Sequence, residues 1–215
     1  MAAAAGGITR VACMPNTKPV IDSSIIVSGV KKRAEEEGYV HVEVIGAITK
    51  GEKGQEITEM GDMAMRGAMA FSDDGHYVGS AHIMLLAAKY AGIFDKALIC
   101  HDIETELNHE GYMHEGACFR PPGGSWGTGH CRRHCRRPGC HHRGIYRHPR
   151  THCPHRQQGR RGHCTPGQKK GIPITCEVAV HHLTLTDEMC SSYSTATRVS
   201  PPLRLGTMWK PCGKP

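Results

Sequence analysis

Short apolar runs alternate with amphipathic stretches over the first hundred residues of the chain. The pattern predicts strands at residues 8–14, 40–45, 68–71 and 97–100, and a further strand at 172–178. Amphipathic helices are predicted at residues 23–37 and 80–91. Ser23 or Ser24 can cap the first of these helices, and Gly38 ends it. Strands that alternate with helices are typical of parallel βαβ units, so the pattern predicts an α/β protein.

Polar residues that can bind ligands or metals follow several of these predicted strands. They are Asn16, Asp74, His101 and the pair His181-His182. In parallel sheets the carboxyl ends of the strands share one edge, and ligands bind there. A simpler interpretation of each residue stays open, because residues 72–75 are also strong turn formers and a histidine after a strand is often structural.

Composition separates one segment from the rest of the chain. The 215 residues suit one large domain or two small ones, and an aromatic content of 5% predicts a small core. Residues 118–164 contain eleven Arg, eight His and six Cys but no Lys, Asp or Glu, whereas the remaining residues hold 16 basic and 20 acidic side chains. The net charge of +7 therefore reflects this segment and not a uniformly basic protein.

The apolar runs are too short to predict a membrane protein. None approaches the about 20 residues that a transmembrane helix needs, and no signal-peptide pattern opens the chain. We therefore expect a cytoplasmic protein without a membrane partner.

Five segments together resemble one enzyme family. They are residues 3–9 (AAAGGIT), 13–22 (CMPNTKPVID), 46–51 (GAITKG), 71–75 (FSDDG) and 201–204 (PPLR). Their combination resembles the dihydroorotases, which belong to the metal-dependent cyclic amidohydrolases. The resemblance covers residues 2–117 and 169–205 and implies part of a (β/α)8 TIM barrel of the amidohydrolase type.

The resemblance also implies a reaction and a site. The family interconverts N-carbamoyl-aspartate and dihydroorotate in pyrimidine biosynthesis, so a small-molecule substrate is expected, nucleic acid is not, and a homo-oligomer stays open. Asp74 and His101 correspond to metal ligands and Asn16 to a substrate-binding side chain. Zinc, as two ions in the intact family site, would activate a hydroxide that attacks the amide carbonyl.

Departures from the family pattern bear on activity and on substrate. The family's His-x-His metal pair precedes the region present here, and its catalytic Asp follows it, so no catalytic residue is assigned. Ser200 stands where the family has a substrate-binding Asn, as in dihydropyrimidinase or hydantoinase-type relatives. These relatives, and a non-catalytic barrel relative, remain alternatives, and the 215-residue chain is expected to be inactive as a fragment.

The Cys/His/Arg-rich segment admits three interpretations. A zinc-binding module at residues 118–164 is one, although its cysteines form no Cys-x-x-Cys pair, and an Arg-rich nucleic-acid-binding module there is a second. Out-of-frame translation is another, because the codons of residues 150–155, taken one base later, permit Val-His-Ile-Ala-His, and residues 207–215 permit helix-like sequence in the other offset. In frame, the segment shows no strand pattern that would orient His152 or His155.

These observations divide the chain into four parts. Residues 1–117 are predicted to form the N-terminal part of the barrel, and residues 169–205 later barrel strands. Residues 118–168 are predicted to be non-native or disordered, because they bury too little apolar surface to offset the entropy of ordering. Residues 206–215 are predicted to be a non-native tail.

Overall fold

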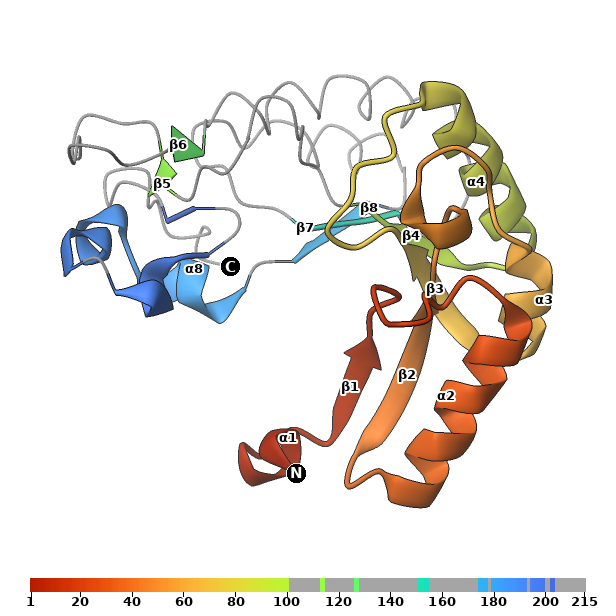
Figure 1. Ribbon diagram of the computed structural model, residues 1–215, viewed down its shortest axis with the longest axis horizontal. Coiled ribbons are helices and arrows are strands. Elements are labelled where there is room, and N and C mark those ends of the chain that lie inside the picture. Colours follow the sequence, from red (N-terminus) through yellow and green to blue (C-terminus); the bar gives the residue numbers. More distant parts are fainter. Residues whose placement is uncertain are drawn as a thin grey trace.

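A six-stranded parallel sheet forms the centre of the computed structural model (Figure 1). The structure describes residues 1–100, 113–114, 126–127, 151–154, 174–177, 179–192, 194–199 and 202–203. The strand order is β1-β2-β3-β4-β7-β8, and each neighbouring pair is parallel. The strands are β1 (Arg10–Cys13), β2 (His41–Gly46), β3 (Ala68–Ser72), β4 (Ala97–Ile99), β7 (Thr151–Pro154) and β8 (Ile174–Glu177). A separate parallel pair consists of β5 (Met113–His114) and β6 (Trp126–Gly127).

Three helices connect the first four strands and pack against the same face of the sheet (Figure 1). They are α2 (Ser24–Glu37), α3 (Met60–Met65) and α4 (Ala81–Ile93). The short helix α1 (Ala2–Ala5) precedes β1, and the 3-10 turn η1 (Lys50–Glu52) follows β2. Beyond β8 come α8 (Val180–Thr184), η2 (Asp187–Ser192) and η3 (Thr195–Thr197). Among the described helices, none is long and apolar enough to cross a bilayer.

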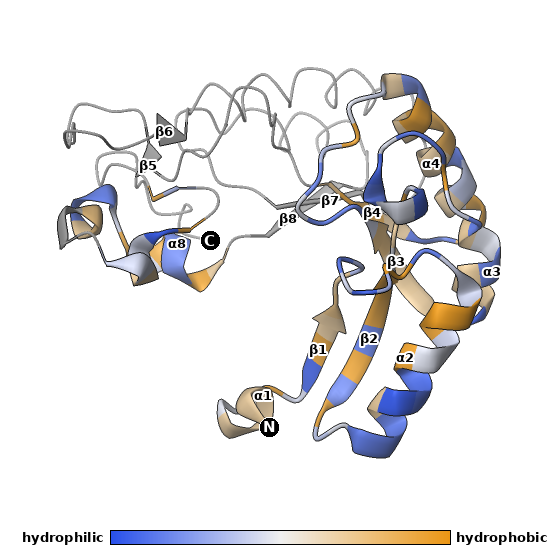
Figure 2. Cartoon of the chain, viewed as in Figure 1, coloured by the Kyte–Doolittle hydropathy of each residue, from blue (hydrophilic) through white to orange (hydrophobic). Residues whose placement is uncertain are grey.

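Neighbouring residues of a strand supply two different apolar layers, because successive side chains point to opposite faces of a sheet. Val44, Phe71 and Leu98 pack with the helices, which contribute residues such as Val27 and Met63. Ile45, Ala70 and Ile99, the sequence neighbours of these strand residues, form a second cluster. Burial on both faces explains why the end of β2 and most of β3 are hydrophobic, whereas the exposed start of β2 alternates with polar residues (Figure 2).

The parallel α/β prediction is confirmed, and most predicted elements lie within a few residues of those observed. The helix predicted at 23–37 is α2, with Ser23 at the N-cap position, although its side chain makes no capping hydrogen bond. Helix α3 was not predicted, since six residues are too few to show a periodic pattern. His181 and His182, which we expected just past a strand, belong to the short helix α8.

One expectation for the Cys/His/Arg-rich segment is corrected. The sequence shows no strand pattern there, yet β7 is a strand of the main sheet, between β4 and β8. The pairing of β7 with β4 and β8 outweighs the weak strand propensity of residues 151–154. Apart from β5, β6 and β7, whose side chains are not described, the segment lies outside the described residues, so its predicted disorder stays a prediction.

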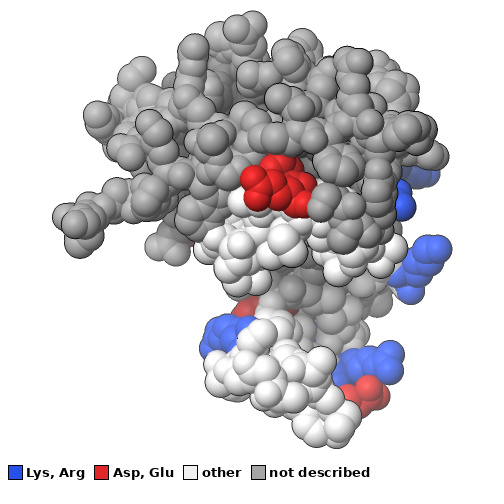
Figure 3. Space-filling model, turned by 90° about the vertical axis from the view of Figure 1, so that its left-hand side faces the viewer, with Lys and Arg blue, Asp and Glu red and all other residues white. Residues whose placement is uncertain are grey.

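Charge on the described surface is scattered. The face in Figure 3 shows Lys and Arg side chains set apart from one another, one acidic group bordering residues without charge, and smaller acidic patches beside basic side chains. Helix α2 pairs its charges along its own axis, with Lys32 near Glu36 and Arg33 near Glu37. Such exposed pairs contribute little to stability, about 0.3–0.5 kcal/mol each. The eleven arginines of residues 118–164 lie outside the described side chains.

Candidate active site

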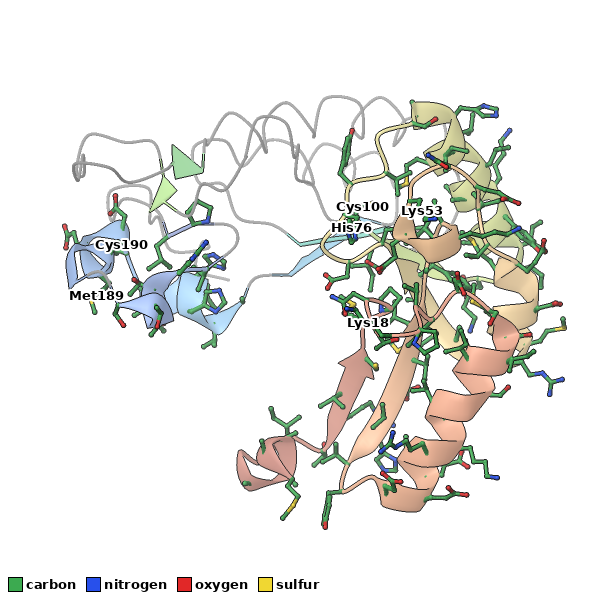
Figure 4. All side chains as sticks on the ribbon, in the orientation of Figure 1. Lys18, Lys53, His76, Cys100, Met189 and Cys190 are labelled. Carbon is green, nitrogen blue, oxygen red and sulfur yellow. The ribbon has the colours of Figure 1, made fainter. Side chains whose placement is uncertain are left out.

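The loops that follow β1, β2 and β3 meet at the carboxyl edge of the sheet. Because the strands are parallel, the residues after each strand lie at the same edge. Main-chain contacts join these loops, since the Ala47 N–H donates to the Ile21 carbonyl at 2.8 Å. The Gly51 N–H donates to Asp22 Oδ2 at 3.0 Å. Figure 4 shows Lys18, Lys53, His76 and Cys100 at this end of the sheet.

Asn16 and Asp74, two of the predicted site residues, are brought into direct contact. The Asn16 side-chain amide donates from Nδ2 to Asp74 Oδ2 at 2.7 Å, across 58 positions of sequence. Asn16 is exposed, and Asp74 is half-buried. A side-chain amide and a carboxylate at the rim of a parallel sheet can hold a polar ligand, and the carboxylate can also ligate a metal.

Asp73 lies next to Asp74 but faces inward. Its side chain is buried, with a relative exposure of 2%, and Oδ1 accepts hydrogen bonds from the backbone N–H groups of Ile48 at 2.8 Å and Thr49 at 2.9 Å. Oδ2 accepts a short hydrogen bond from the Thr49 hydroxyl. Burial raises the pKa of Asp73, and the hydrogen bonds from Thr49 and Ile48 oppose that rise. The carboxylate thus fastens the loop after β2 to the end of β3.

A second acidic residue, Glu52, is buried at the same edge, and the hydrogen-bonding capacity of its carboxylate is not fully used within the described residues. Its side chain is 4% exposed, and Oε1 has no hydrogen-bond partner among the described residues. Oε2 lies 3.8 Å from Nδ1 of His76, a largely exposed side chain on the loop after β3. Burial is the main cause of the raised pKa of Glu52; His76 lowers it, and Asp73, Asp74 and Asp22 raise it further.

Sequence reasoning missed Asp73, Thr49 and Glu52 as parts of the site. It treated Asp73 as part of a turn, which its Ser-Asp-Asp-Gly context also predicts. The one available signal was that residues 46–51 and 71–75 both belong to the family-like motifs.

The remaining predicted residues are not joined to this pair by the described contacts. His101 and Ser200 lie outside the described residues. The rings of His181 and His182 lie with their centroids 4.2 Å apart and their planes tilted by 50°, and His182 is buried. In the part of the chain that the structure describes, no three His, Cys, Asp or Glu side chains are grouped closely enough to hold a metal ion.

The fold defines the class of protein first. The chain superposes on L-hydantoinase (dihydropyrimidinase) from Arthrobacter aurescens with a TM-score of 0.74 at 16% sequence identity, covering 96% of this chain and 47% of that one. A D-hydantoinase gives a TM-score of 0.68 at 14% identity, with the same coverage of both chains. At such identities the likeness concerns the fold alone, and it confirms the predicted part of a (β/α)8 barrel.

The sequence then identifies the family. Residues 1–142 match the dihydro-orotase-like family, and the chain belongs to it. It is 38% identical over 205 residues to a dihydroorotase of Acetivibrio thermocellus, and 41% identical over 221 aligned positions to a dihydroorotase of Pelotomaculum thermopropionicum. The alignments cover 95% and 94% of this chain but 48% and 47% of these proteins, so the chain spans about half the length of the relatives it matches.

Proposed function

We propose that this chain is part of a dihydroorotase, which reversibly opens the ring of dihydroorotate to N-carbamoyl-aspartate in pyrimidine biosynthesis. The observation that carries the proposal is the contact between Asn16 and Asp74 at the carboxyl edge of the sheet. It lies in a chain 38–41% identical to proteins named dihydroorotase. The substrate would be a small molecule handled in the cytoplasm, and a homo-oligomer remains compatible with this function.

The residues of this edge suit part of a zinc site. Asp74 supplies a half-buried carboxylate, and His101, which directly follows Cys100 after β4, would supply an imidazole. Carboxylate and imidazole are common zinc ligands in hydrolases. When bound, zinc would supply a hydroxide near neutral pH and polarise the amide carbonyl, and the family site holds two such ions.

The chain's own residues would bind and orient the substrate. Asn16 can donate from its amide nitrogen and accept at its amide oxygen, which suits the mixed donors and acceptors of a cyclic amide. Asp74 holds that amide in one orientation through the 2.7 Å hydrogen bond. Ser200 is proposed as a second substrate contact.

The 215-residue polypeptide is nevertheless expected to be inactive by itself. Asp74 and His101 are two ligands of a larger set, and the groups of a catalytic unit act together, so losing one can remove most of the rate. The test is ring opening of dihydroorotate by the purified chain with added zinc, beside a full-length control in which the reading frame is corrected. We expect turnover at least ~10³-fold below that control. Comparable turnover would contradict the proposed incompleteness of the site.

A hydantoinase-type reaction is the second candidate, and Ser200 is the observation that favours it. A serine at this position cannot offer the two-donor amide of the family's Asn, so it suits a ring without the dihydroorotate carboxylate. The frame-corrected control should therefore also be assayed with hydantoin and dihydrouracil. Faster turnover of either than of dihydroorotate would replace the first assignment with the second.

We further propose that residues 118–168 and 206–215 are translated out of frame. The in-frame segment is rich in Arg, His and Cys and poor in apolar residues, whereas family-like sequence resumes after it. Resequencing the gene from codon 110 to codon 215 tests this directly, and a confirmed in-frame sequence would refute it. Slow amide hydrogen exchange throughout residues 118–168 would also contradict it, because a non-native segment has no cooperative core to protect it.

A further inference from the structure

We propose that Asp73 is a positioning residue, which acts with the Thr49 hydroxyl to hold Asp74 and Asn16 in contact. Asp73 is not among the residues assigned above to a substrate or a metal, and its described hydrogen bonds go to Ile48 and Thr49. It is joined instead to the backbone of the neighbouring loop, one residue away from the predicted ligand Asp74. That Asp73 serves catalysis rests on the proposed function. That it holds Asp74 and Asn16 in contact does not.

The direction of each hydrogen bond in this cluster is fixed. The Thr49 hydroxyl oxygen accepts from the Gly54 N–H at 2.8 Å, and its single proton is donated to Asp73 Oδ2. Asp73 Oδ1 is occupied by two backbone N–H donors. Thr49 and Asp73 are 0% and 2% exposed, so water cannot replace either partner without local opening. The cluster therefore requires an acceptor-only group at position 73, which a carboxylate is and an amide is not.

The cluster also connects the two halves of the predicted site. Asp73 holds the loop after β2, and that loop contacts the loop after β1 through the Ala47 N–H bond to the Ile21 carbonyl. Asn16 is on the loop after β1, whereas Asp74 directly follows Asp73. Fixing three loops in this way sets the separation across which Asn16 donates to Asp74. Positions held by buried hydrogen bonds of this kind are the ones that pre-organise a site.

Thr49 offers a matched pair of substitutions. Thr49→Val keeps the shape of the side chain but removes the hydroxyl, leaving Asp73 Oδ2 and the Gly54 N–H without partners. Thr49→Ser keeps the hydroxyl and removes only a methyl group. Asp73→Asn is a second, independent variant, because its amide nitrogen would face a hydroxyl whose proton then has no acceptor.

The experiment follows the side-chain amide of Asn16 by ¹⁵N–¹H NMR in the complete 215-residue chain. Asp74→Ala supplies the reference shift of an Asn16 amide that has lost its partner. We expect Thr49→Val and Asp73→Asn to move the Asn16 side-chain resonances more than half of the way to that reference, and Thr49→Ser to leave them near the wild-type values. The backbone resonances of residues 33–37, at the end of α2 that leads into the start of β2, report whether the fold is retained.

Each other outcome overturns the proposal. Unchanged Asn16 resonances in a folded Thr49→Val chain would show that the cluster does not position the pair. An equal shift in Thr49→Ser would assign the effect to packing. Loss of the fold in both Thr49→Val and Asp73→Asn would make Asp73 a general structural residue. Since this readout needs neither zinc nor turnover, it can succeed while the activity assay fails, and the reverse also holds.

Discussion

Glu52 is expected to destabilise the native chain at neutral pH, and Glu52→Gln should therefore be stabilising. The Glu52 side chain is 4% exposed, and Oε1 has no hydrogen-bond partner among the described residues. Its nearest basic group, Nδ1 of the largely exposed His76, is 3.8 Å from Oε2, which is too long for a hydrogen bond. The residue also has φ of 57°, in the left-handed region that costs an L-residue about 1–2 kcal/mol.

The structure sets the size of the expected gain. A buried polar group without a partner costs about 1–3 kcal/mol, and more when it is charged. The attraction between the Glu52 carboxylate and an exposed histidine at this distance stabilises the folded chain by at most about 1 kcal/mol. Gln has nearly the same shape and no charge, but it still buries one polar group. We therefore expect Glu52→Gln to raise the free energy of unfolding by about 1 kcal/mol at pH 7.

The sign of the pH dependence follows from the raised pKa of Glu52. Because burial raises this pKa, the folded chain binds the Glu52 proton up to a higher pH than the unfolded chain does. The stability that this proton confers is fully present below the ordinary glutamate pKa of about 4.3 and is lost as pH rises through the folded value. The advantage of Glu52→Gln over wild type should thus grow between pH 4 and pH 7.

Urea unfolding at pH 4, 5, 6 and 7 measures this difference, with circular dichroism as the readout. Glu35→Gln, at an exposed position of α2, is the matched control and should show no growing advantage. The difference between Glu52→Gly and Glu52→Gln reports the backbone strain, because both variants lack the carboxylate and relief of a left-handed φ does not depend on pH. A Glu52→Gln chain that is less stable than wild type at pH 7 would show that Glu52 has a stabilising partner, and would refute this reasoning.

Two further substitutions test the core and a helix cap. Phe71 is 0% exposed, so Phe71→Ala should lower the free energy of unfolding by about 3–5 kcal/mol in urea titrations, whereas a loss below about 1 kcal/mol would mean that β3 is not buried as described. The Ser80 hydroxyl accepts from the Ile83 N–H at 3.3 Å as the cap of α4, so Ser80→Ala should cost about 1 kcal/mol in the same assay. An unchanged midpoint for Ser80→Ala would show that this cap contributes nothing measurable.

The first hundred residues were predictable because their local pattern agrees with their environment. Strands β2, β3 and β4 contribute neighbouring residues to the apolar clusters on both faces of the sheet, and this agrees with the alternating or apolar patterns from which they were predicted. Helix α2 was predicted to within one residue at its start because Ser23 precedes it and Gly38 follows it. Helix α3 gave no such signal, since its six residues include the buried Gly61 and form a helix through packing against β3 and α4.

The candidate site was predictable only in its exposed part. Asn16 and Asp74 follow strands, and parallel topology alone places them at one edge, where they meet. The roles of Asp73 and Glu52 depend on whether a side chain points inward, and adjacent acidic residues in a turn do not reveal this. Glu52 adds a second difficulty, because a left-handed backbone is ordinarily expected at glycine. Both Glu52 and the neighbouring Gly51 have it here.

Strand β7 was unpredictable for a reason that bears on the origin of its segment. An inner strand of a parallel sheet is typically a run of branched apolar residues, and proline is disfavoured there because it cannot donate to the ladder. Residues 151–154 are Thr-His-Cys-Pro, yet they pair on one side with β4 and on the other with β8. The shifted frame of residues 150–155 permits Val-His-Ile-Ala-His, which has no proline and includes the branched apolar residues Val and Ile. The position of β7 in the sheet and the shifted codons thus agree on the same few residues, and this agreement supports out-of-frame translation over a grafted zinc or nucleic-acid module.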